Sequence, residues 1–593
     1  MKDSKTIDTG ILFREFSSVK RKYRSDWTEA QGHLVALFGA AVSIFSTSLM
    51  TSIAFGLFYQ VDTKGVMGIA ASLASGGITG VIQALFGGNP MTVAGQTGPV
   101  SIVYSYCYRF ANGQNIPFLP WVGWIGVWTC ILHMLTGYLG LCRYRVIITP
   151  FTGQIFEMLV AADFITTGIR NLVDEFRNTS DGRLNGVLGL LLGFGYVVLA
   201  LILQRSRKWS FTSRGMTKVL AIFSAFIALV VFVLFSWFPF WTVEGWPLDL
   251  PQRPGIGAEW GRPGLNMNII VDMGEVPVGF VFAAIIPAIM LTVLFYVDHN
   301  ISSMAAYGED YNFEKPTHYD FDFFILGLSA LVCGLLGLPA SSGLIPQNPM
   351  HSRACLHFDK DKNHRVIDQR ISPLIHSLLL LVMLLVLPAI EWIPTCLIWS
   401  FFLVLATEAF SAHNEFFCRV MFLVTSKQLI RNNWNFVFLD VVPGDVIMRF
   451  TLLQLSCFIF VYMLAVGLVL VGGHEAMWPV IGVSFPVAIL LFAVPFRSKF
   501  MKKWFLEEHL LVLDSSEALV RDDIEIESYP EDELEPEYEG RGAQLRQHVV
   551  EYNEVEAMVE KAEHERIASD STSVAQSRNE IRARHVSREM TSM

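Results

Sequence analysis

The chain has 593 residues, of which 52% are hydrophobic and only 17% are charged, and its mean hydropathy is +0.43. Globular domains carry about 25% charged residues, so composition excludes a soluble multidomain enzyme and favours a multi-span membrane protein. The net charge of −10 comes from the tail, because residues 507–593 hold 23 acidic and 9 basic residues and residues 1–506 have a net charge of +4. No basic surface for a nucleic acid is indicated.

Twelve apolar segments approach the roughly 20 residues that a spanning helix needs. In chain order they are 33–59, 65–86, 119–140, 151–172, 185–204, 218–240, 276–297, 321–336, 374–390, 392–413, 450–471 and 477–496. Two further stretches, 91–108 and 340–356, are apolar but interrupted by Gly, Pro and small polar residues. We expect these two stretches to cross the membrane as well, which gives fourteen crossings and places both termini on one side.

With fourteen crossings, 28 Lys and Arg residues of residues 1–506 lie on the side of the termini and 7 on the other. Positive residues stay in the cytoplasm, so we predict that both termini are cytoplasmic. The predicted organisation is a short cytoplasmic N-terminus, a first repeat, an extracellular loop, a second repeat and a mainly disordered, acidic cytoplasmic tail. The respective ranges are 1–32, 33–242, 243–275, 276–496 and 497–593.

The two interrupted stretches have matching positions. In each, small residues lead to a proline, Pro99 or Pro346, and proline is favoured at the first position of a helix. Pro99 lies 66 residues after the start of the first span, and Pro346 lies 70 residues after the start of the span at 276. Seven crossings in each half make the halves inverted relative to each other. One such break alone is more simply a kink, but two in register indicate the binding site of a transporter.

Each half-helix would present free N–H groups and about half a positive charge at its N-terminus, which suits a monovalent oxyanion. Neutral polar residues around these ends, including Ser341, would hydrogen-bond the hydroxyl groups of the substrate. Asp298 is the acid within a span that we expect to act there; the alternative is an interfacial aspartate at the end of the span. The predicted substrate-binding residues are Gln96, Thr97, Gly98, Pro99, Asp298, Ser342, Leu344, Ile345, Pro346 and Gln347.

Other polar residues within apolar segments are expected to be structural. Glu157, Asp163 and Glu408 are expected to pair with nearby donors, and His133, His351 and His413 to be hydrogen-bonded packing residues, because no metal-binding spacing accompanies the histidines. The eight cysteines include no CxxC pair, which argues against a disulfide framework or a zinc site. We expect neither a metal nor a cofactor. Residues 425–448 are typical of an interfacial amphipathic helix.

Several separated motifs resemble the bicarbonate-transporter (anion-exchanger) family, and most closely its boron-transporter branch. They are GQTGPVSIVYSY at 95–106, FTGQIFE at 151–157, FYVDHNI at 295–301, LIPQNPMHSRA at 344–354 and HNEFFCRV at 413–420. The resemblance implies an all-α membrane fold of fourteen segments in two inverted repeats with two half-helices. It also implies core and gate domains, usually in a homodimer, and a carboxylate beside the substrate at Asp298.

The chain departs from the animal anion exchangers in two places. Gln347 stands where those proteins carry an arginine, and residues 101–106 lack their paired carboxylates. The resemblance therefore implies borate export by a fungal-type member rather than sodium-coupled bicarbonate transport. The alternatives are exchange of bicarbonate or another small oxyanion, an anion channel of the same fold, and a membrane enzyme, for which no nucleophile or metal pattern is present. We expect the plasma membrane as location, with an internal membrane such as the vacuole as the alternative.

Overall fold

The computed structural model describes residues 10–463 and 501–514, apart from residues 148, 178–181, 211–212, 239–250, 255–269, 309–310, 346, 359–363, 410–414 and 426–437. The chain divides into two compact units, Met1–Val420 with Arg449–Trp504, and Met421–Met448 with Phe505–Met593. In the second unit, the described residues include the short helices α21 (Phe438–Val441) and α28 (Glu507–Leu513). All predicted site residues belong to the first unit.

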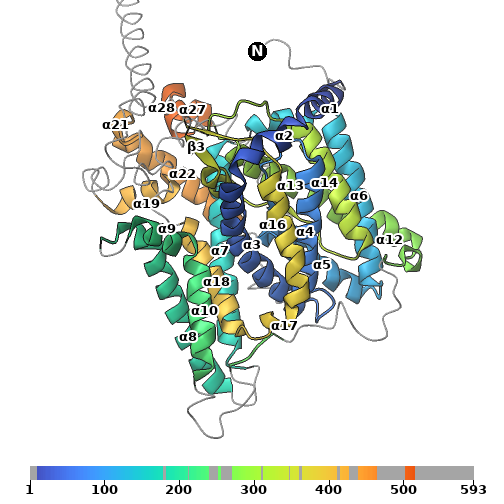
Figure 1. Cartoon of the computed structure of the whole chain (residues 1–593), viewed down its shortest axis with the longest axis vertical. Helices are drawn as coiled ribbons and strands as arrows, with labels where there is room; N and C mark the ends of the chain where they lie inside the picture. The colour runs from blue at the N-terminus through green and yellow to red at the C-terminus, as the bar shows by residue number, and fades with distance from the viewer. Residues whose placement is uncertain are drawn as a thin grey trace, which may run out of the picture. The chain divides into compact units, whose positions relative to one another are not determined.

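Helices form almost all of the regular structure (Figure 1). The longer ones are α3 (Leu34–Asp62), α4 (Ile69–Phe86), α5 (Gly98–Gly113), α6 (Phe118–Tyr138), α7 (Pro150–Asp174), α8 (Gly182–Gln204), α10 (Ser224–Ser236), α13 (Ile285–Ala306), α14 (Tyr319–Leu335), α16 (Ile371–Val382), α18 (Thr395–Ala409) and α22 (Gly444–Tyr462). The shorter ones are α1 (Ile11–Lys22), α2 (Ser25–Thr28), α9 (Arg214–Ile222), α12 (Val278–Ala283), α15 (Gln347–Ala354), α17 (Leu387–Ile390), α19 (Glu415–Val424) and α27 (Lys502–Trp504). The main 3₁₀ turns are η1 (Glu29–His33), η2 (Leu141–Ile147), η3 (Arg205–Lys208), η5 (Met273–Glu275) and η7 (Met383–Val386).

Helices occupy every predicted span except 477–496, which lies outside the described residues. Three spans are broken rather than continuous. The span 218–240 consists of α9 and α10, the span 374–390 consists of α16, η7 and α17, and the span 276–297 consists of α12 and α13. Pro388 explains the second break, because it lies in the first turn of α17 and cannot donate to the preceding helical turn.

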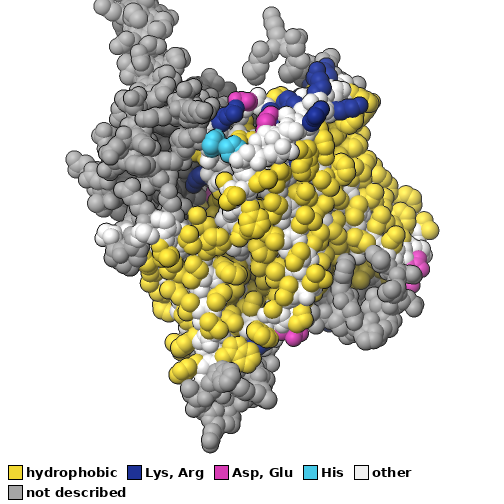
Figure 2. Space-filling model, in the orientation of Figure 1, with side chains coloured by type: hydrophobic (Ala, Val, Ile, Leu, Met, Phe, Trp, Pro, Cys, Tyr) yellow, Lys and Arg dark blue, Asp and Glu magenta, His cyan; other side chains and the backbone are white. Residues whose placement is uncertain are grey.

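Seven of the described helices are long and apolar enough to cross a membrane, or eight if α9 and α10 form one bent span. The count of fourteen crossings remains a prediction. Figure 2 shows a broad hydrophobic outer face over these helices. Exposed hydrophobic side chains of the described helices and 3₁₀ turns include Leu191 at 62% and Leu385 at 83% exposure. A contiguous apolar surface of this kind is suited to contact with lipid.

Close backbone contacts hold the helices of the first unit together. A Cβ atom added to Gly126 of α6 would lie 2.9 Å from the Cα of Gly334 of α14, so these two helices cross with their backbones in contact. Likewise, a Cβ on Gly56 of α3 would collide with the Cα of Ile69 of α4. Small residues allow such close packing between helices in membranes, and this packing fixes the segments that carry the interrupted stretches.

The N-terminal segment is more ordered than its polar sequence suggests. Residues 11–33 fold into α1, α2 and η1, and Asp26 is only 3% exposed. Arg370, itself 1% exposed, donates to Asp26 over 2.9 Å and to the carbonyl oxygens of Ala84 and Gly87 over 3.0 Å each. Because those two carbonyls end α4, the N-terminal segment supports the start of the first interrupted stretch.

Candidate functional site

The two interrupted stretches meet in the structure. Strand β1 (Ala94–Gly95) pairs antiparallel with strand β2 (Ser342–Gly343), with Ala94 opposite Gly343 and Gly95 opposite Ser342. These four residues are buried. Two segments almost 250 residues apart in the sequence thus form one small ladder inside the first unit.

A half-helix follows each strand. Thr97 has extended backbone angles and precedes α5, and Pro99 lies in the first turn of that helix. Helix α15 begins at Gln347, while Pro346 lies outside the described residues. Antiparallel strands continue in opposite directions, so the two helix N-termini lie at the two ends of the ladder. The first N–H groups of a helix lack partners within the helix and carry partial positive charge.

Asp298 of α13 lies beside this ladder. Its side chain is 2% exposed, and its Oδ2 atom accepts a hydrogen bond from the Ser342 hydroxyl over 2.7 Å. Thr97 also lies beside this carboxylate. Among the described residues, no Lys or Arg forms an ion pair with Asp298. The carboxylate is therefore surrounded by hydroxyl groups and helix ends rather than by a fixed cation.

The two helix ends differ in how their buried polar atoms are bonded. At α15, Oε1 of Gln347 has no hydrogen-bond partner within the described part of the chain, whereas at α5 the Thr97 hydroxyl bonds to the Asp298 carboxylate. Most buried polar groups in proteins are hydrogen-bonded, and leaving one unpaired costs about 1–3 kcal/mol. The unpaired oxygen at the start of α15 is consistent with a ligand that completes its bonding.

Gln96 differs from Gln347 because its side-chain amide is occupied by the protein. The Tyr59 hydroxyl donates to its Oε1 over 2.9 Å, and its Nε2 contacts the hydroxyls of Ser75 and Ser341 over 2.9 and 2.7 Å. The amide is fully buried. The geometry therefore favours a positioning role for Gln96, which holds the two interrupted stretches together, over direct contact with a ligand.

The apolar members of the predicted set pack around the ladder. The Leu344 N–H donates to the carbonyl of Val93 over 3.0 Å, and its side chain touches Gly95, where an added Cβ would lie only 2.9 Å away. Gly98 similarly leaves no room for a side chain against Phe164, at 2.8 Å. Ile345 is partly exposed. Leu344 and Gly98 thus fix the backbone around the ladder.

The sequence reasoning missed a polar clamp on the same ladder. His299 Nε2 contacts Asp322 Oδ2 over 2.9 Å, and the Gly343 N–H donates to His299 Nδ1 over 3.1 Å. The other oxygen of Asp322 accepts from the N–H groups of Gly88 and Asn89 over 2.9 and 3.1 Å. One carboxylate therefore holds the first interrupted stretch directly and the second through an imidazole. Because Nδ1 accepts, Nε2 must carry the proton given to Asp322.

His133 and His351 are hydrogen-bonded packing residues, as predicted. His133 is fully buried, contacts the carbonyl of Thr129 over 2.8 Å and stacks on Phe323. His351 contacts the carbonyl of Met91 and the hydroxyl of Ser372 over 2.9 and 2.6 Å. His413 lies outside the described residues, as do the side chain of Glu408 and residues 426–437, which are half of the predicted interfacial helix at 425–448.

A second buried polar cluster joins α7, α19 and α22. Arg419 is fully buried and contacts Glu415 Oε2 over 3.3 Å, Gln154 Oε1 over 2.5 Å and Gln454 Oε1 over 2.8 Å. Glu415 is 3% exposed. None of these four residues was predicted to interact, because their positions are scattered over 300 residues of sequence.

Comparison with known proteins is consistent with this geometry. The family model described as the HCO3- transporter integral membrane domain matches residues 9–187 and 181–518. Probable boron transporter 7 of Arabidopsis thaliana is 29% identical over 608 residues, covering 86% of this chain and 88% of its own length. Boron transporter 1 of Saccharomyces cerevisiae is 28% identical over 371 residues, covering 60% of this chain and 62% of its own length.

A solved structure shares the fold. The transmembrane domain of a cyanobacterial bicarbonate transporter, BicA, aligns with 74% of this chain and 98% of its own, with a TM-score of 0.50 and 18% identity. At this identity the similarity concerns the fold alone. It supports a mostly helical membrane fold of the transporter type.

Proposed function

Because this chain belongs to the HCO3- transporter integral membrane domain family, we propose that it is a secondary transporter that exports borate by alternating access. The anion is held between the N-termini of α5 and α15. Two curated relatives carry the name boron transporter, and this supports the assignment of substrate. The proposed setting is a homodimer in the plasma membrane with both termini cytoplasmic.

The observation that carries the proposal is the unpartnered Oε1 of Gln347 at the start of α15, together with the Thr97 hydroxyl at the start of α5 beside Asp298. Two helix N-termini together supply nearly one positive charge, which balances one monovalent anion. Thr97 and Gln347 add neutral hydrogen-bonding atoms. A ligand with one negative charge and several hydroxyl groups satisfies all of these groups at once.

The neutral character of Gln347 favours borate over bicarbonate. Tetrahydroxyborate presents four hydroxyl donors, whereas bicarbonate presents one, and the unpartnered Oε1 of Gln347 can only accept a hydrogen bond. An arginine at this position would offer donors only. The site is therefore better suited to a substrate that donates hydrogen bonds than to one that mostly accepts them.

Release also fits a site without a fixed cation. Transport requires binding that is weak enough to reverse, and the dipole of one helix contributes only about 0.3–2 kcal/mol. Movement of the segments that carry α5 and α15 against the remaining helices would then open the site to either side. The proposed core and gate domains are the bodies that would move.

Reconstitution into proteoliposomes tests the proposal. We expect borate flux that saturates with concentration, depends on the pH gradient and shows counter-flow when borate is present on both sides. Equal or faster flux of bicarbonate would favour an oxyanion exchanger of the same fold instead. A flux that rises linearly with concentration and shows no counter-flow would identify an anion channel and refute alternating access.

A further inference from the structure

Helix α1 has one face packed against the body of the first unit. Val19 is 8% exposed and packs with Phe321 and Ile325 of α14. Phe16 lies over Phe321 with a ring separation of 5.7 Å, and Glu15 accepts a hydrogen bond from the Phe321 N–H over 2.7 Å. These contacts fix the orientation of α1, so its other face is presented outward in a defined way.

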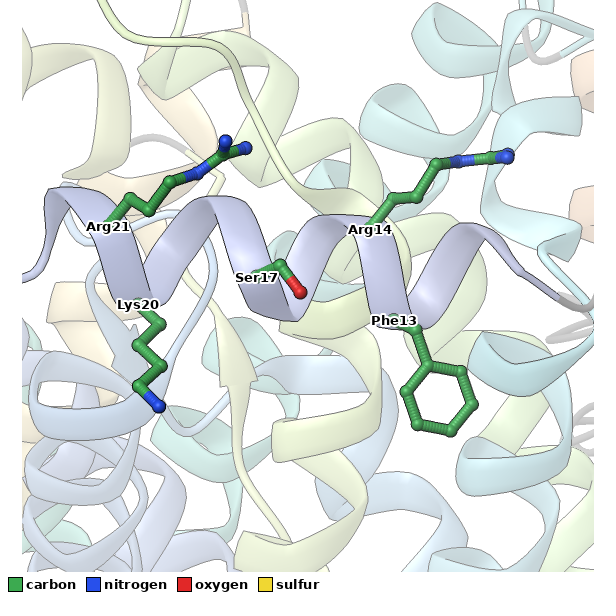
Figure 3. A pocket seen from close by; sticks show the side chains of 5 residues that line it. All are labelled: Phe13, Arg14, Ser17, Lys20 and Arg21. Carbon is green, nitrogen blue, oxygen red and sulfur yellow. The ribbon is translucent and has the colours of Figure 1, made fainter.

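The outward face of α1 combines an aromatic ring with cations. Phe13, Arg14, Ser17, Lys20 and Arg21 are all exposed and line a shallow surface hollow. In Figure 3, Arg14 and Arg21 extend from one side of the helix, Phe13 and Lys20 extend from the opposite side, and Ser17 lies between them. Phe13 is 66% exposed, which is unfavourable for this side chain in water.

The charge of this segment is strongly positive. Residues 11–24 contain five Lys or Arg residues and one acid, Glu15. Glu15 does not neutralise the outward face, because its carboxylate is bonded to the first turn of α14. Lys20 and Arg21 form no ion pair within the described residues. An anionic partner is therefore favoured by charge.

The position of α1 identifies the kind of anion. In Figure 2, the Lys and Arg side chains near α1 gather at the border of the broad hydrophobic face. An amphipathic helix with aromatic and basic residues at such a border lies in the membrane interface, with its apolar residues at the level of the acyl chains. Basic clusters beside spanning helices attract anionic lipids by about 1 kcal/mol per Lys or Arg.

We propose that the outward face of α1 binds the headgroup of an anionic phospholipid. The phosphate lies against Arg14, Ser17 and Arg21, and Phe13 enters the acyl region beside it, with Lys20 contacting a neighbouring headgroup. This site is separate from the half-helix ends and does not depend on which anion the protein transports. Because α1 is fixed to α14, the lipid also stabilises the first turn of α14.

The test uses the purified full-length chain in a mild, uncharged detergent. Dioctanoyl phosphatidylserine, dioctanoyl phosphatidylcholine and inorganic phosphate are each titrated against the midpoint of thermal unfolding. We expect phosphatidylserine to raise the midpoint, phosphatidylcholine to have a much weaker effect, and inorganic phosphate to have none at the same concentration. In K20Q/R21Q, the phosphatidylserine concentration for half of the effect should rise by roughly 25-fold, or about fivefold per lost charge.

The matched control is R177Q/R183Q, which removes two charges from exposed residues elsewhere. It should respond to phosphatidylserine as the wild type does. Equal responses to both lipids, equal responses of the two double variants, or an equal effect of inorganic phosphate would each refute the lipid site. If K20Q/R21Q does not fold, the wild type in 0.5 M salt replaces it, where the phosphatidylserine effect should largely disappear. A salt-independent effect would then refute the proposal.

Discussion

Two buried carboxylates within the first unit have very different surroundings. Glu415 is paired with the fully buried guanidinium of Arg419 and with the amide of Gln154. Asp298 is bonded to a serine hydroxyl and lies beside the N-terminus of α5, without an ion pair among the described residues. Both side chains are nearly inaccessible, at 3% and 2% exposure.

From this difference we infer a structural role for Glu415 and a role in transport for Asp298. A buried ion pair is stable only while both partners are present, because the loss of one leaves an uncompensated charge. Glu415 and Arg419 are therefore suited to holding α7, α19 and α22 together. The charge of Asp298 is balanced only by dipoles and by whatever ion occupies the site, so it can change as an anion or a proton arrives.

The largest effect should come from breaking the ion pair at Arg419. Arg419→Met leaves Glu415 buried without its cation, which costs about 3–5 kcal/mol of the roughly 5–15 kcal/mol that stabilises a folded domain. We expect little folded protein by size-exclusion chromatography. Adding Glu415→Gln should restore much of it, because the stranded charge is removed.

Arg177→Met is the matched control, since Arg177 is 76% exposed and pairs with Asp174 at 3.5 Å. An exposed pair contributes at most about 1 kcal/mol, so this variant should be obtained at wild-type yield. If Arg419→Met is as stable as Arg177→Met, the cluster does not hold the three helices together.

The next largest effect concerns the clamp that Asp322 and His299 form on the ladder. The surroundings of Asp322 are intermediate between those of Glu415 and those of Asp298. Asp322→Asn can still accept from Gly88 and Asn89, but its amide then meets the protonated Nε2 of His299, and two donors face each other. Changing the His299 tautomer moves the conflict to the Gly343 N–H. One buried donor is left unpaired in either case, at a cost of about 1–3 kcal/mol.

We expect Asp322→Asn to lower the thermal unfolding midpoint and to raise the KM for borate, because β2 is less well placed. Asp320→Asn is the control on the same helix. Asp320 accepts from the Cys142 N–H over 2.9 Å, and an asparagine oxygen can do the same. Equal effects of Asp322→Asn and Asp320→Asn would show that the bond from His299 to Asp322 contributes no more than ordinary helix packing does.

A fixed charge placed at the helix end should make the site more like an ion pair. Gln347→Arg adds a permanently charged donor, and charged hydrogen bonds exceed neutral ones by about 1 kcal/mol. We expect binding of chloride or bicarbonate to tighten by roughly fivefold, while borate efflux slows because release is hindered. Isothermal titration and flux on the same preparation measure both. Unchanged anion selectivity in the folded variant would remove Gln347 from the site.

The smallest effect concerns a third acid, Glu15, outside the spanning segments. Burial raises the pKa of Glu15 to about 7, and the carboxylates of Asp320 and Asp322 add to the rise. The folded state thus binds this proton more tightly than the unfolded state, where the pKa is near 4.5. The resulting stabilisation is complete below pH 4.5 and is lost as the pH rises through 7.

Glu15→Gln removes this dependence while keeping an oxygen that accepts from Phe321. We expect the variant to match the wild type at pH 5 and to exceed it at pH 8 by on the order of 1 kcal/mol, allowing for partial exposure. Thermal unfolding at both pH values measures this. Glu29→Gln, at a carboxylate whose side chain is 49% exposed, is the control and should leave the pH difference unchanged. A Glu15→Gln curve parallel to the wild type would contradict the burial argument.

The sequence was sufficient to locate the helices and the two interrupted stretches, because long apolar runs and Gly-Pro breaks are local signals. The matching positions of those breaks predicted two half-helices at one site, but the pairing of β1 with β2 was not predicted. The predicted set also included Thr97 and Gln347, the polar residues at the two helix ends. Gln96 was predicted to bind the substrate because it is a polar residue next to the break in the first interrupted stretch. Only the structure shows that its amide is bonded to Ser75 and Ser341.

The clamp and the Arg419 cluster could not be found from local patterns. Asp322 looks like an ordinary first-turn residue of α14, and its bond to His299 depends on how α13 and α14 cross. The N-terminal segment was predicted only as a short cytoplasmic N-terminus, because the sequence does not show that one of its charged residues, Asp26, is the buried partner of Arg370. Contacts between distant segments carry no periodic signal in a single sequence.

The pH dependence of borate flux in Asp298→Asn tests the central claim most directly. Asparagine has the shape of the protonated aspartate but stays neutral, so anion and proton occupancy are no longer linked. In vesicles of matched protein content at several pH values, the account predicts a variant that reaches the membrane and binds borate, but whose reduced flux no longer varies with pH. A variant with the wild-type pH profile would contradict the account and make Asp298 a structural residue like Glu415.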